Sequence, residues 1–134
     1  MSRKTARENV YKLVFEYLFC QEKDSLSYKI LSDNPNVSQE DMQFISSNYS
    51  GIIEHYDEIL EKISQYAKGF SLERIYKPDL AALVLAVYEM TYTDIPKTVA
   101  ISEALDIVKA YSTDKSSSFV NGVLAGIYKD LENK

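Results

Sequence analysis

Apolar residues recur at helical spacing along almost the whole of this 134-residue chain. Near the N-terminus they occupy positions i, i+3, i+4, i+7 and i+8, in a stripe formed by Val10, Leu13, Val14, Tyr17 and Leu18. A second stripe consists of Met42, Ile45, Tyr49, Ile52, Ile53 and Tyr56. No segment shows the two-residue alternation of a half-buried strand, and four glycines and three prolines leave little room for turn-rich β architecture. The sequence therefore predicts an all-α fold.

Breaks in the helical spacing predict about seven helices in a single domain, 1–134. We expect them at about 7–21, 27–31, 38–56, 57–68 and 78–93, with two more marked by apolar residues within 101–108 and 119–131, and one short turn at 71–75. Ser38 is expected to cap its helix, Asp57 to cap or open the next one, and Pro78 to occupy a first helical position. From Asp79 to Met90 the only charges are Asp79 and Glu89, so we expect this helix to be buried on most sides.

Composition and charge exclude several classes of protein. No segment approaches the roughly 20 apolar residues of a membrane-spanning helix, and the basic start is not followed by a signal-peptide core. The single cysteine cannot form an internal disulfide, so a cytoplasmic protein is expected. The net charge is −5, but residues 1–12 hold four cations against one anion. Any contact with a polyanion is therefore expected at the N-terminal end.

The residues that carry enzyme chemistry are sparse and do not form a motif. His55 is the only histidine and has no cysteine nearby, so a surface position is favoured over a metal site. Cys20 is interpreted as a buried or half-buried thiol, and the serines at 116–118 as a helix N-cap. We therefore expect no catalytic residues, no metal and no cofactor.

The basic N-terminal segment is a candidate site for RNA. On a helix, Arg3, Lys4, Arg7, Tyr11 and Phe15 fall within an arc of roughly 120°. Cations beside aromatic rings suit a single-stranded nucleic acid, because charges contact phosphates and rings stack on unpaired bases. The alternative is a solubilising helix start with the two rings packed on the core, and the spacing alone favours this alternative.

Two glycines interrupt helical stripes. Gly51 lies within the second stripe, and Asn121-Gly122 lies within the last one. Both residue types lower helix stability, glycine by about 1 kcal/mol relative to alanine. We therefore expect another helix to pack closely at Gly51, and close backbone approach or a specific hydrogen bond at Asn121-Gly122.

Motifs along nearly the whole chain resemble the NusB family of bacterial transcription antitermination factors. The strongest are Ile95-Pro96-x-x-Val99-Ala100-Ile101-Ser102-Glu103-Ala104 and Phe119-Val120-Asn121-Gly122-Val123-Leu124. The basic start, the turn at 71–75 and the apolar helix at 79–90 are similar to further parts of the family pattern. The resemblance implies a compact seven-helix fold of two packed subdomains. It also implies binding to a small-subunit ribosomal protein, NusE, and with it to single-stranded boxA RNA, so that RNA polymerase reads through terminators.

The resemblance also implies roles for particular residues. Arg3, Lys4 and Arg7 match the RNA-binding segment, and Phe15 stands where a tyrosine is common. Asp79 matches an acidic position that contacts the protein partner, and Phe119 an aromatic residue at the shared protein and RNA surface. Lys115 stands where the family usually has an acid in this partner-binding region. Phe70 replaces a common tryptophan and is interpreted as a substitution within the core, whereas Leu80 and Val84 replace frequent basic residues.

Three phosphate contacts on a single strand would give a salt slope of roughly −2, which predicts weak RNA binding by the isolated chain. Two other functions stay open at this point. One is a helical protein–protein adaptor that contacts no RNA. The other is a relative of RNA methyltransferases with a similar helical domain, which the lack of a glycine-rich cofactor motif disfavours. The oligomeric state also stays open, with a homodimer as one alternative.

Overall fold

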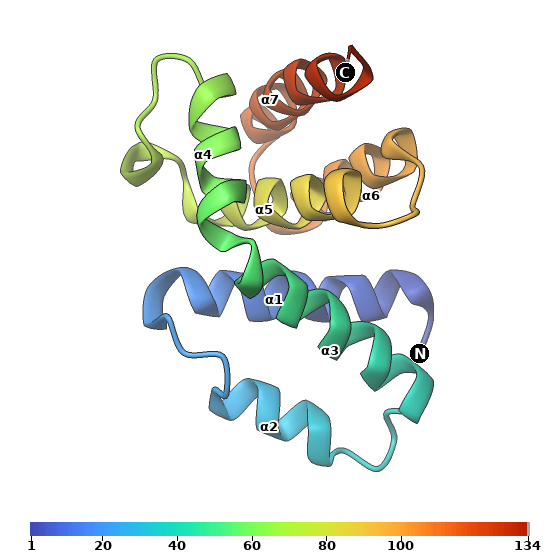
Figure 1. The fold of residues 1–134 in the computed structure, drawn as a ribbon. Coiled ribbons are helices and arrows are strands. Elements are labelled where there is room, and N and C mark those ends of the chain that lie inside the picture. Colours follow the sequence, from blue (N-terminus) through green and yellow to red (C-terminus); the bar gives the residue numbers. More distant parts are fainter. Residues whose placement is uncertain (134) are drawn as a thin grey trace.

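The computed structural model describes residues 1–133, and within that range the chain forms seven α-helices, one 3₁₀ turn and no strand (Figure 1). The prediction of an all-α fold with seven helices is confirmed. The elements are α1 (Arg3–Cys20), α2 (Leu26–Asp33), α3 (Gln39–Glu54), α4 (Tyr56–Tyr66), η1 (Leu72–Arg74), α5 (Lys77–Tyr92), α6 (Lys97–Tyr111) and α7 (Asp114–Glu132).

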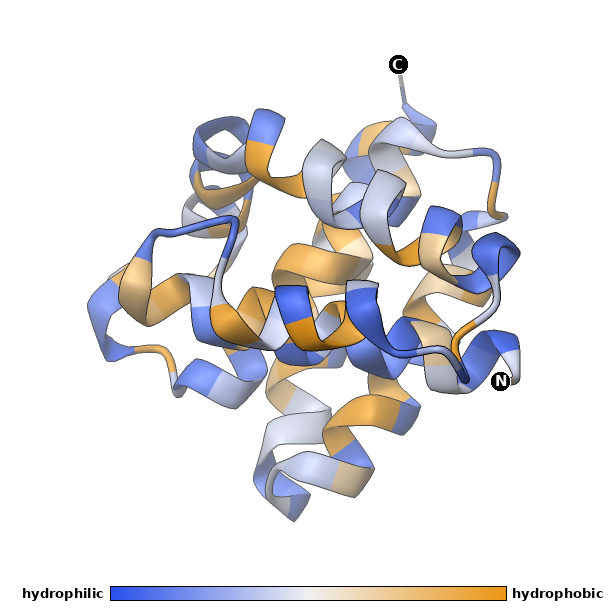
Figure 2. Ribbon diagram, turned by 90° about the horizontal axis from the view of Figure 1, so that it is seen from below, coloured by the Kyte–Doolittle hydropathy of each residue, from blue (hydrophilic) through white to orange (hydrophobic). Residues whose placement is uncertain are grey.

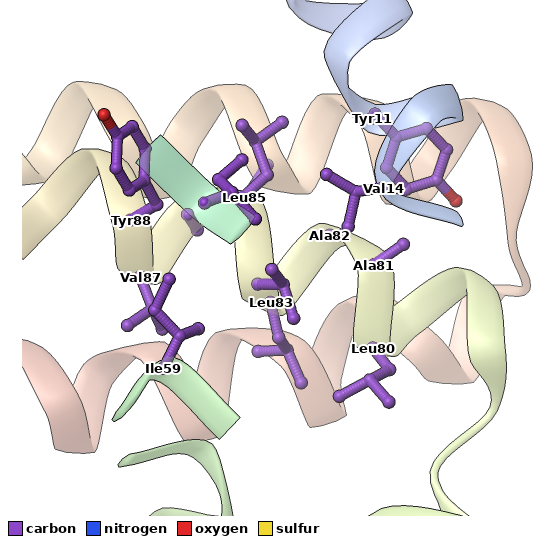
Figure 3. Packing of buried hydrophobic residues seen from close by; sticks show 14 of the residues in the cluster. Tyr11, Val14, Ile59, Leu80, Ala81, Ala82, Leu83, Leu85, Val87 and Tyr88 are labelled. Carbon is purple, nitrogen blue, oxygen red and sulfur yellow. The ribbon is translucent and has the colours of Figure 1, made fainter. Parts of the chain in front are cut away.

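The helices form two packed groups, as expected. Helices α1, α2 and α3 lie together on one side, and α4, α6 and α7 surround α5 on the other (Figure 1). Helix α5 joins the two groups, because it packs against α1 and α3 as well as α4, α6 and α7. All twelve residues from Asp79 to Met90 are buried, so α5 is the centre of the core (Figure 3). Figure 2 shows the hydropathy of the residues: hydrophobic residues lie on the central helices, and hydrophilic residues lie in most outer turns.

Several helix boundaries follow from local chemistry. The Ser38 hydroxyl accepts a hydrogen bond from the Asp41 backbone N–H, which confirms the expected cap, and Pro78 lies in the first turn of α5. Three boundaries differ from the prediction. Helix α1 already begins at Arg3, because the Ser2 side chain caps it. Helix α4 begins after His55 without a side-chain cap, and α7 begins after Thr113, so the serines at 116–118 lie inside its first turns.

The glycines pack in two different ways. A β-carbon at Gly51 would overlap the ring and hydroxyl of Tyr88, so α3 and α5 approach closely there as predicted. A β-carbon at Gly126 would lie only 2.7 Å from the Tyr66 ring, so α7 and α4 are also closely packed. Gly122 differs from the expectation, since a β-carbon there would meet no atom within 4 Å. Asn121 and Gly122 are both exposed, and the close approach in α7 occurs one turn later.

Among the described residues, none of the helices combines the length and the hydrophobicity required to span a membrane.

Candidate functional site

The first turn of α1 exposes two cations. The Arg3 guanidinium lies 4.0 Å from the centre of the Phe44 ring on α3, a cation–π contact that holds the side chain at the surface. The Lys4 ammonium lies 4.0 Å from an oxygen of Asp106 on α6, and both side chains are largely exposed. Because exposed pairs of this kind contribute little to stability, Lys4 can exchange Asp106 for a phosphate at little cost.

Arg7 lies in the interior and does not extend the exposed basic surface. It is 6% exposed, and its Nε atom donates to both carboxylate oxygens of Glu89 on α5, at 3.1 and 3.0 Å. Its Nη1 atom lies 3.6 Å from Glu103 on α6. Burial raises the pKa of Glu89, and the neighbouring Arg7 opposes that shift. The sequence placed Arg7 with the RNA-binding cations, whereas the structure makes it an internal link between α1, α5 and α6.

The three residues expected to face a protein partner lie around one cavity. Asp79 at the start of α5, and Lys115 and Phe119 on α7, line a hollow of about 370 Å³, which we call the partner cavity. Its other lining residues come from the segment around η1 and from the start of α7: Phe70, Arg74, Ile75, Tyr76, Thr113 and Ser116. Residues more than 30 positions apart in the sequence therefore meet at one surface.

Phe70 belongs to this cavity and not to the core. Its side chain is 49% exposed, and its ring packs edge-on against Phe119 with centroids 5.2 Å apart. The interpretation of Phe70 as a substitution within the core is therefore wrong. The chain turns at Gly69, where φ is +85°, and the segment after α4 then carries the Phe70 ring onto α7. An exposed ring packed on a partly buried one, beside a buried carboxylate, is typical of a binding surface.

Asp79 is held in place at the base of the partner cavity. It is 5% exposed and accepts a hydrogen bond of 2.6 Å from the Ser112 hydroxyl, which in turn lies 2.9 Å from the Ser116 hydroxyl. Thr113 completes the network through a second 2.9 Å contact with Ser116. Ser112 therefore orients Asp79 with the support of Ser116, and α7 has no side-chain cap, so the prediction that the serines at 116–118 cap the helix is wrong.

A second hollow lies beside Phe15, on the other side of the start of α5. Tyr11, Lys12, Phe15, Pro78 and Tyr111 line about 240 Å³, which we call the aromatic cavity. The Tyr11 hydroxyl donates to the Pro78 carbonyl at 3.0 Å. Burial, assisted by Asp79, raises the pKa of Tyr11 to about 12. Because Pro78 lines one cavity and Asp79 the other, the two cavities meet at the first turn of α5.

Sequence reasoning missed two residues of this second hollow. Lys12 is one of the N-terminal cations, but it lies outside the arc of roughly 120° that holds Lys4 and Phe15. Tyr111, at the end of α6, is 96 positions from Phe15 and has no local signature. Only the packing of α6 against α5, and of α5 against α1, brings the two rings to the same hollow.

The other residues considered in the sequence, Cys20 and His55, are not part of either cavity. Within residues 1–133 no three histidine, cysteine, aspartate or glutamate side chains gather in a way that could hold a metal ion. Cys20 is exposed, so the expectation of a buried or half-buried thiol is wrong. His55 is partly buried and stacks on Tyr92, with ring centroids 3.9 Å apart.

Solved structures share this architecture. A structure of NusB from T. maritima superimposes with a TM-score of 0.85 at 33% sequence identity, covering 96% of this chain and 92% of that one. A crystal structure of the antitermination factors NusB and NusE in complex with dsRNA matches with a TM-score of 0.83 at 22% identity, covering 96% of both chains. The second match supports the fold alone, because its sequence identity is low.

The sequences agree with this similarity of fold. The chain is 35% identical over 134 residues to the transcription antitermination protein NusB of Finegoldia magna, covering 99% of this chain and 98% of that protein. It is 41% identical to the protein of the same name from Agathobacter rectalis, with 93% and 98% covered. The model of the NusB family matches residues 4–129. The chain therefore belongs to the NusB family of transcription antitermination proteins.

Proposed function

We propose that this protein promotes transcription antitermination by binding single-stranded boxA RNA together with the small-subunit ribosomal protein NusE. The observation that carries the proposal is that the partner cavity and the aromatic cavity lie on either side of the start of α5. The solved NusB of similar fold is in complex with NusE and dsRNA, so this fold is compatible with both kinds of ligand. Proteins of this family are not enzymes, so the chemistry required of the surface is recognition.

The two cavities suit different ligands. Arg3, Lys4 and Phe15 are assigned to RNA, because two exposed cations and an aromatic ring on the same helix match the phosphates and bases of an unpaired strand. The partner cavity is assigned to NusE, with Asp79 and Phe119 as the main contacts and Lys115 at the rim. Arg7 is left out of the RNA surface because Glu89 already holds it in the interior.

Weak RNA binding by the isolated chain follows from this assignment. With Arg7 buried, two exposed cations remain in the first turn of α1, and two phosphate contacts on a single strand give a salt slope of about −1.4. The rest of the molecule is acidic, with a net charge of −5 for the whole chain. An acidic body repels bulk RNA and attracts a basic ribosomal protein, so the partner must supply the remaining contacts.

The assembled complex would then act on RNA polymerase in the antitermination complex, so that transcription of ribosomal RNA operons continues through terminators. This function requires the protein to be in the cytoplasm, where bacterial transcription takes place.

The test is a titration of fluorescently labelled boxA RNA with this protein, with NusE, and with an equimolar mixture of both. We expect the mixture to bind more tightly than either protein alone, and the advantage to disappear when the boxA sequence is scrambled. Equal affinity for the single proteins and the mixture would reject cooperative recognition.

The burial of Arg7 favours one second candidate, an adaptor that holds NusE but contacts no RNA. Replacing both Arg3 and Lys4 by alanine separates the two functions. The adaptor predicts unchanged boxA affinity of the mixture, whereas the RNA-binding function predicts weaker boxA binding with NusE still bound. Co-elution of the two proteins in gel filtration checks the second condition.

A further inference from the structure

Helix α2 is attached to the rest of the molecule by one face. None of its eight residues is buried, and Tyr28 and Leu31 are the side chains that pack on the core. The Tyr28 hydroxyl lies 2.9 Å from the Ser46 hydroxyl on α3, and the Ser27 hydroxyl donates to Glu16 on α1 at 2.6 Å. Because a helix of this length is marginal in water by itself, α2 depends on tertiary contacts that are few and partly polar.

The opposite face of α2 is apolar at its centre and exposed. Leu26 and Ile30 are 73% and 60% exposed. Together with Lys29 and Asp33 they occupy positions i, i+3, i+4 and i+7, which fall within an arc of about 100° on a helix. We call these four residues the α2 face, and with the turn that follows the helix they line a hollow of about 500 Å³. A contiguous apolar patch rimmed by polar residues marks an interaction surface, whereas single exposed apolar residues are ordinary.

The charges of the α2 face indicate what covers it. Lys29 and Asp33 take part in none of the ion pairs found within residues 1–133. One cation and one anion leave the face without net charge, so it suits neither a polyanion such as RNA nor a strongly basic protein. A reversed copy of the same face, however, has the opposite charge at each position.

The order of the residues along α2 fits such a reversal. A two-fold axis perpendicular to the helix runs two copies of α2 antiparallel and presents the same patch on both chains. With the axis beside Ile30, Lys29 lies about 1.5 Å before it and Asp33 about 4.5 Å after it along the helix. Lys29 of each copy is then within reach of Asp33 of the other, and this ion pair occurs twice. Ile30 meets its own copy, and Leu26 meets the far end of the partner helix.

We propose that the α2 face is the contact surface of a homodimer, in which two copies of this chain pair through antiparallel α2 helices. Leu26 and Ile30 supply the apolar contact, and the reciprocal pairs of Lys29 with Asp33 set the antiparallel direction. The inference is independent of the proposed function.

The position and size of α2 specify what kind of dimer this is. Helix α2 lies at the outer edge of the group formed with α1 and α3, away from α6 and α7, so the pairing leaves the partner cavity uncovered (Figure 1). Eight helical residues extend over only about 12 Å, so the interface is small and the dimer forms at high protein concentration.

The first test is sedimentation equilibrium of the full chain from about 10 μM to about 1 mM, where we expect a reversible change from monomer to dimer. Ile30→Glu should keep the chain monomeric throughout, because two carboxylates would meet at the axis. Val99→Glu on α6 is the matched control: Val99 is a branched residue that is 43% exposed, and its substitution should leave the dimer intact. Circular dichroism checks that both variants keep their helices.

The second test reverses the charges. Lys29→Glu and Asp33→Lys each place like charges opposite one another twice, so each variant alone should dimerise about 2- to 20-fold more weakly than the wild type. An equimolar mixture of the two variants should recover association, because an acidic α2 face then meets a basic one. Fluorescence energy transfer between donor-labelled and acceptor-labelled variants measures the mixed dimer.

The outcomes decide the proposal. A wild-type chain that stays monomeric over the whole range overturns it, and so does a dimer that persists in Ile30→Glu. A mixture of the charge variants that associates no better than either variant alone would remove the antiparallel arrangement. A monomeric wild type combined with weaker NusE binding by Ile30→Glu would instead assign the α2 face to the protein partner.

Discussion

The ion pair between Arg7 and Glu89 joins α1 to α5 inside the protein. Both side chains are almost fully buried, and their two hydrogen bonds replace part of the hydration that each charge loses. A buried pair of this kind adds little net stability compared with apolar residues, but a single remaining charge is very unfavourable. The pair therefore specifies which faces of the two helices meet.

Removal of one partner should show this dependence. We expect Arg7→Ala to lower the free energy of unfolding by about 3–5 kcal/mol, because Glu89 is left as an uncompensated buried charge. Urea denaturation followed by circular dichroism measures the change. The double variant Arg7→Met/Glu89→Leu should recover most of the loss, and Arg3→Ala at the exposed end should alter stability by less than about 0.5 kcal/mol. A loss below about 1 kcal/mol in Arg7→Ala would contradict the assigned role.

At the scale of elements, two glycines in helix interiors have opposite surroundings. Gly51 allows α3 to approach the Tyr88 ring on α5, and Tyr88 itself is nearly buried and stacked on Tyr92. Gly122 on α7 faces open space among the described residues. The first is required for the contact between the two groups of helices, whereas no contact within residues 1–133 requires the second.

The same substitution should therefore change stability in opposite directions. Gly51→Ala should lower the free energy of unfolding by about 1–3 kcal/mol, because the new methyl group displaces the Tyr88 ring. Gly122→Ala should raise it by up to about 1 kcal/mol, since alanine is the better helix former and has room. Thermal and urea unfolding of both variants provide the comparison. Equal shifts of the same sign would show that α3 and α5 do not require close approach.

For the whole molecule, the distribution of charge is the property that matters for assembly. The chain is acidic overall, yet Lys115 places a cation at the rim of the partner cavity. A basic partner approaching Asp79 would meet this like charge at close range. Electrostatic complementarity affects the rate of association more than the strength of the final contacts.

Reversal of that charge should strengthen assembly. Lys115→Asp is expected to raise the affinity for NusE by about 1.5- to 5-fold at low ionic strength, which corresponds to one exposed charge pair. The gain should fall as salt is added, because exposed charges are screened. Surface plasmon resonance at several salt concentrations measures both effects. Lys29→Asp makes the same change in net charge on α2, far from the cavity in sequence, so an equal gain there would refute a local effect.

The helices and their order could be predicted from the sequence because the information is local. Helical spacing, the Ser38 cap and Pro78 act within about one turn of the chain, and the uncharged run within α5 identifies the central helix without any knowledge of its neighbours. The resemblance to the NusB family led to the proposed protein partner and RNA, and the family model matches residues 4–129.

What surrounds each side chain was decided only by tertiary packing. Arg7 and Lys4 lie on the same helix and are both N-terminal cations in the sequence. Only Arg7 is buried, because it pairs with Glu89, which lies 82 positions away in the sequence. The sequence predicts Phe70 in the core, whereas the turn at Gly69 places its ring against Phe119. Both cavities are lined by residues from distant segments of the chain. The residue pattern of a single helix cannot predict which other segments will lie next to it. Local spacing therefore specifies the helices and the central one among them. Which of their side chains are free to bind follows from the tertiary structure, because burial and pairing depend on neighbours that are remote along the chain.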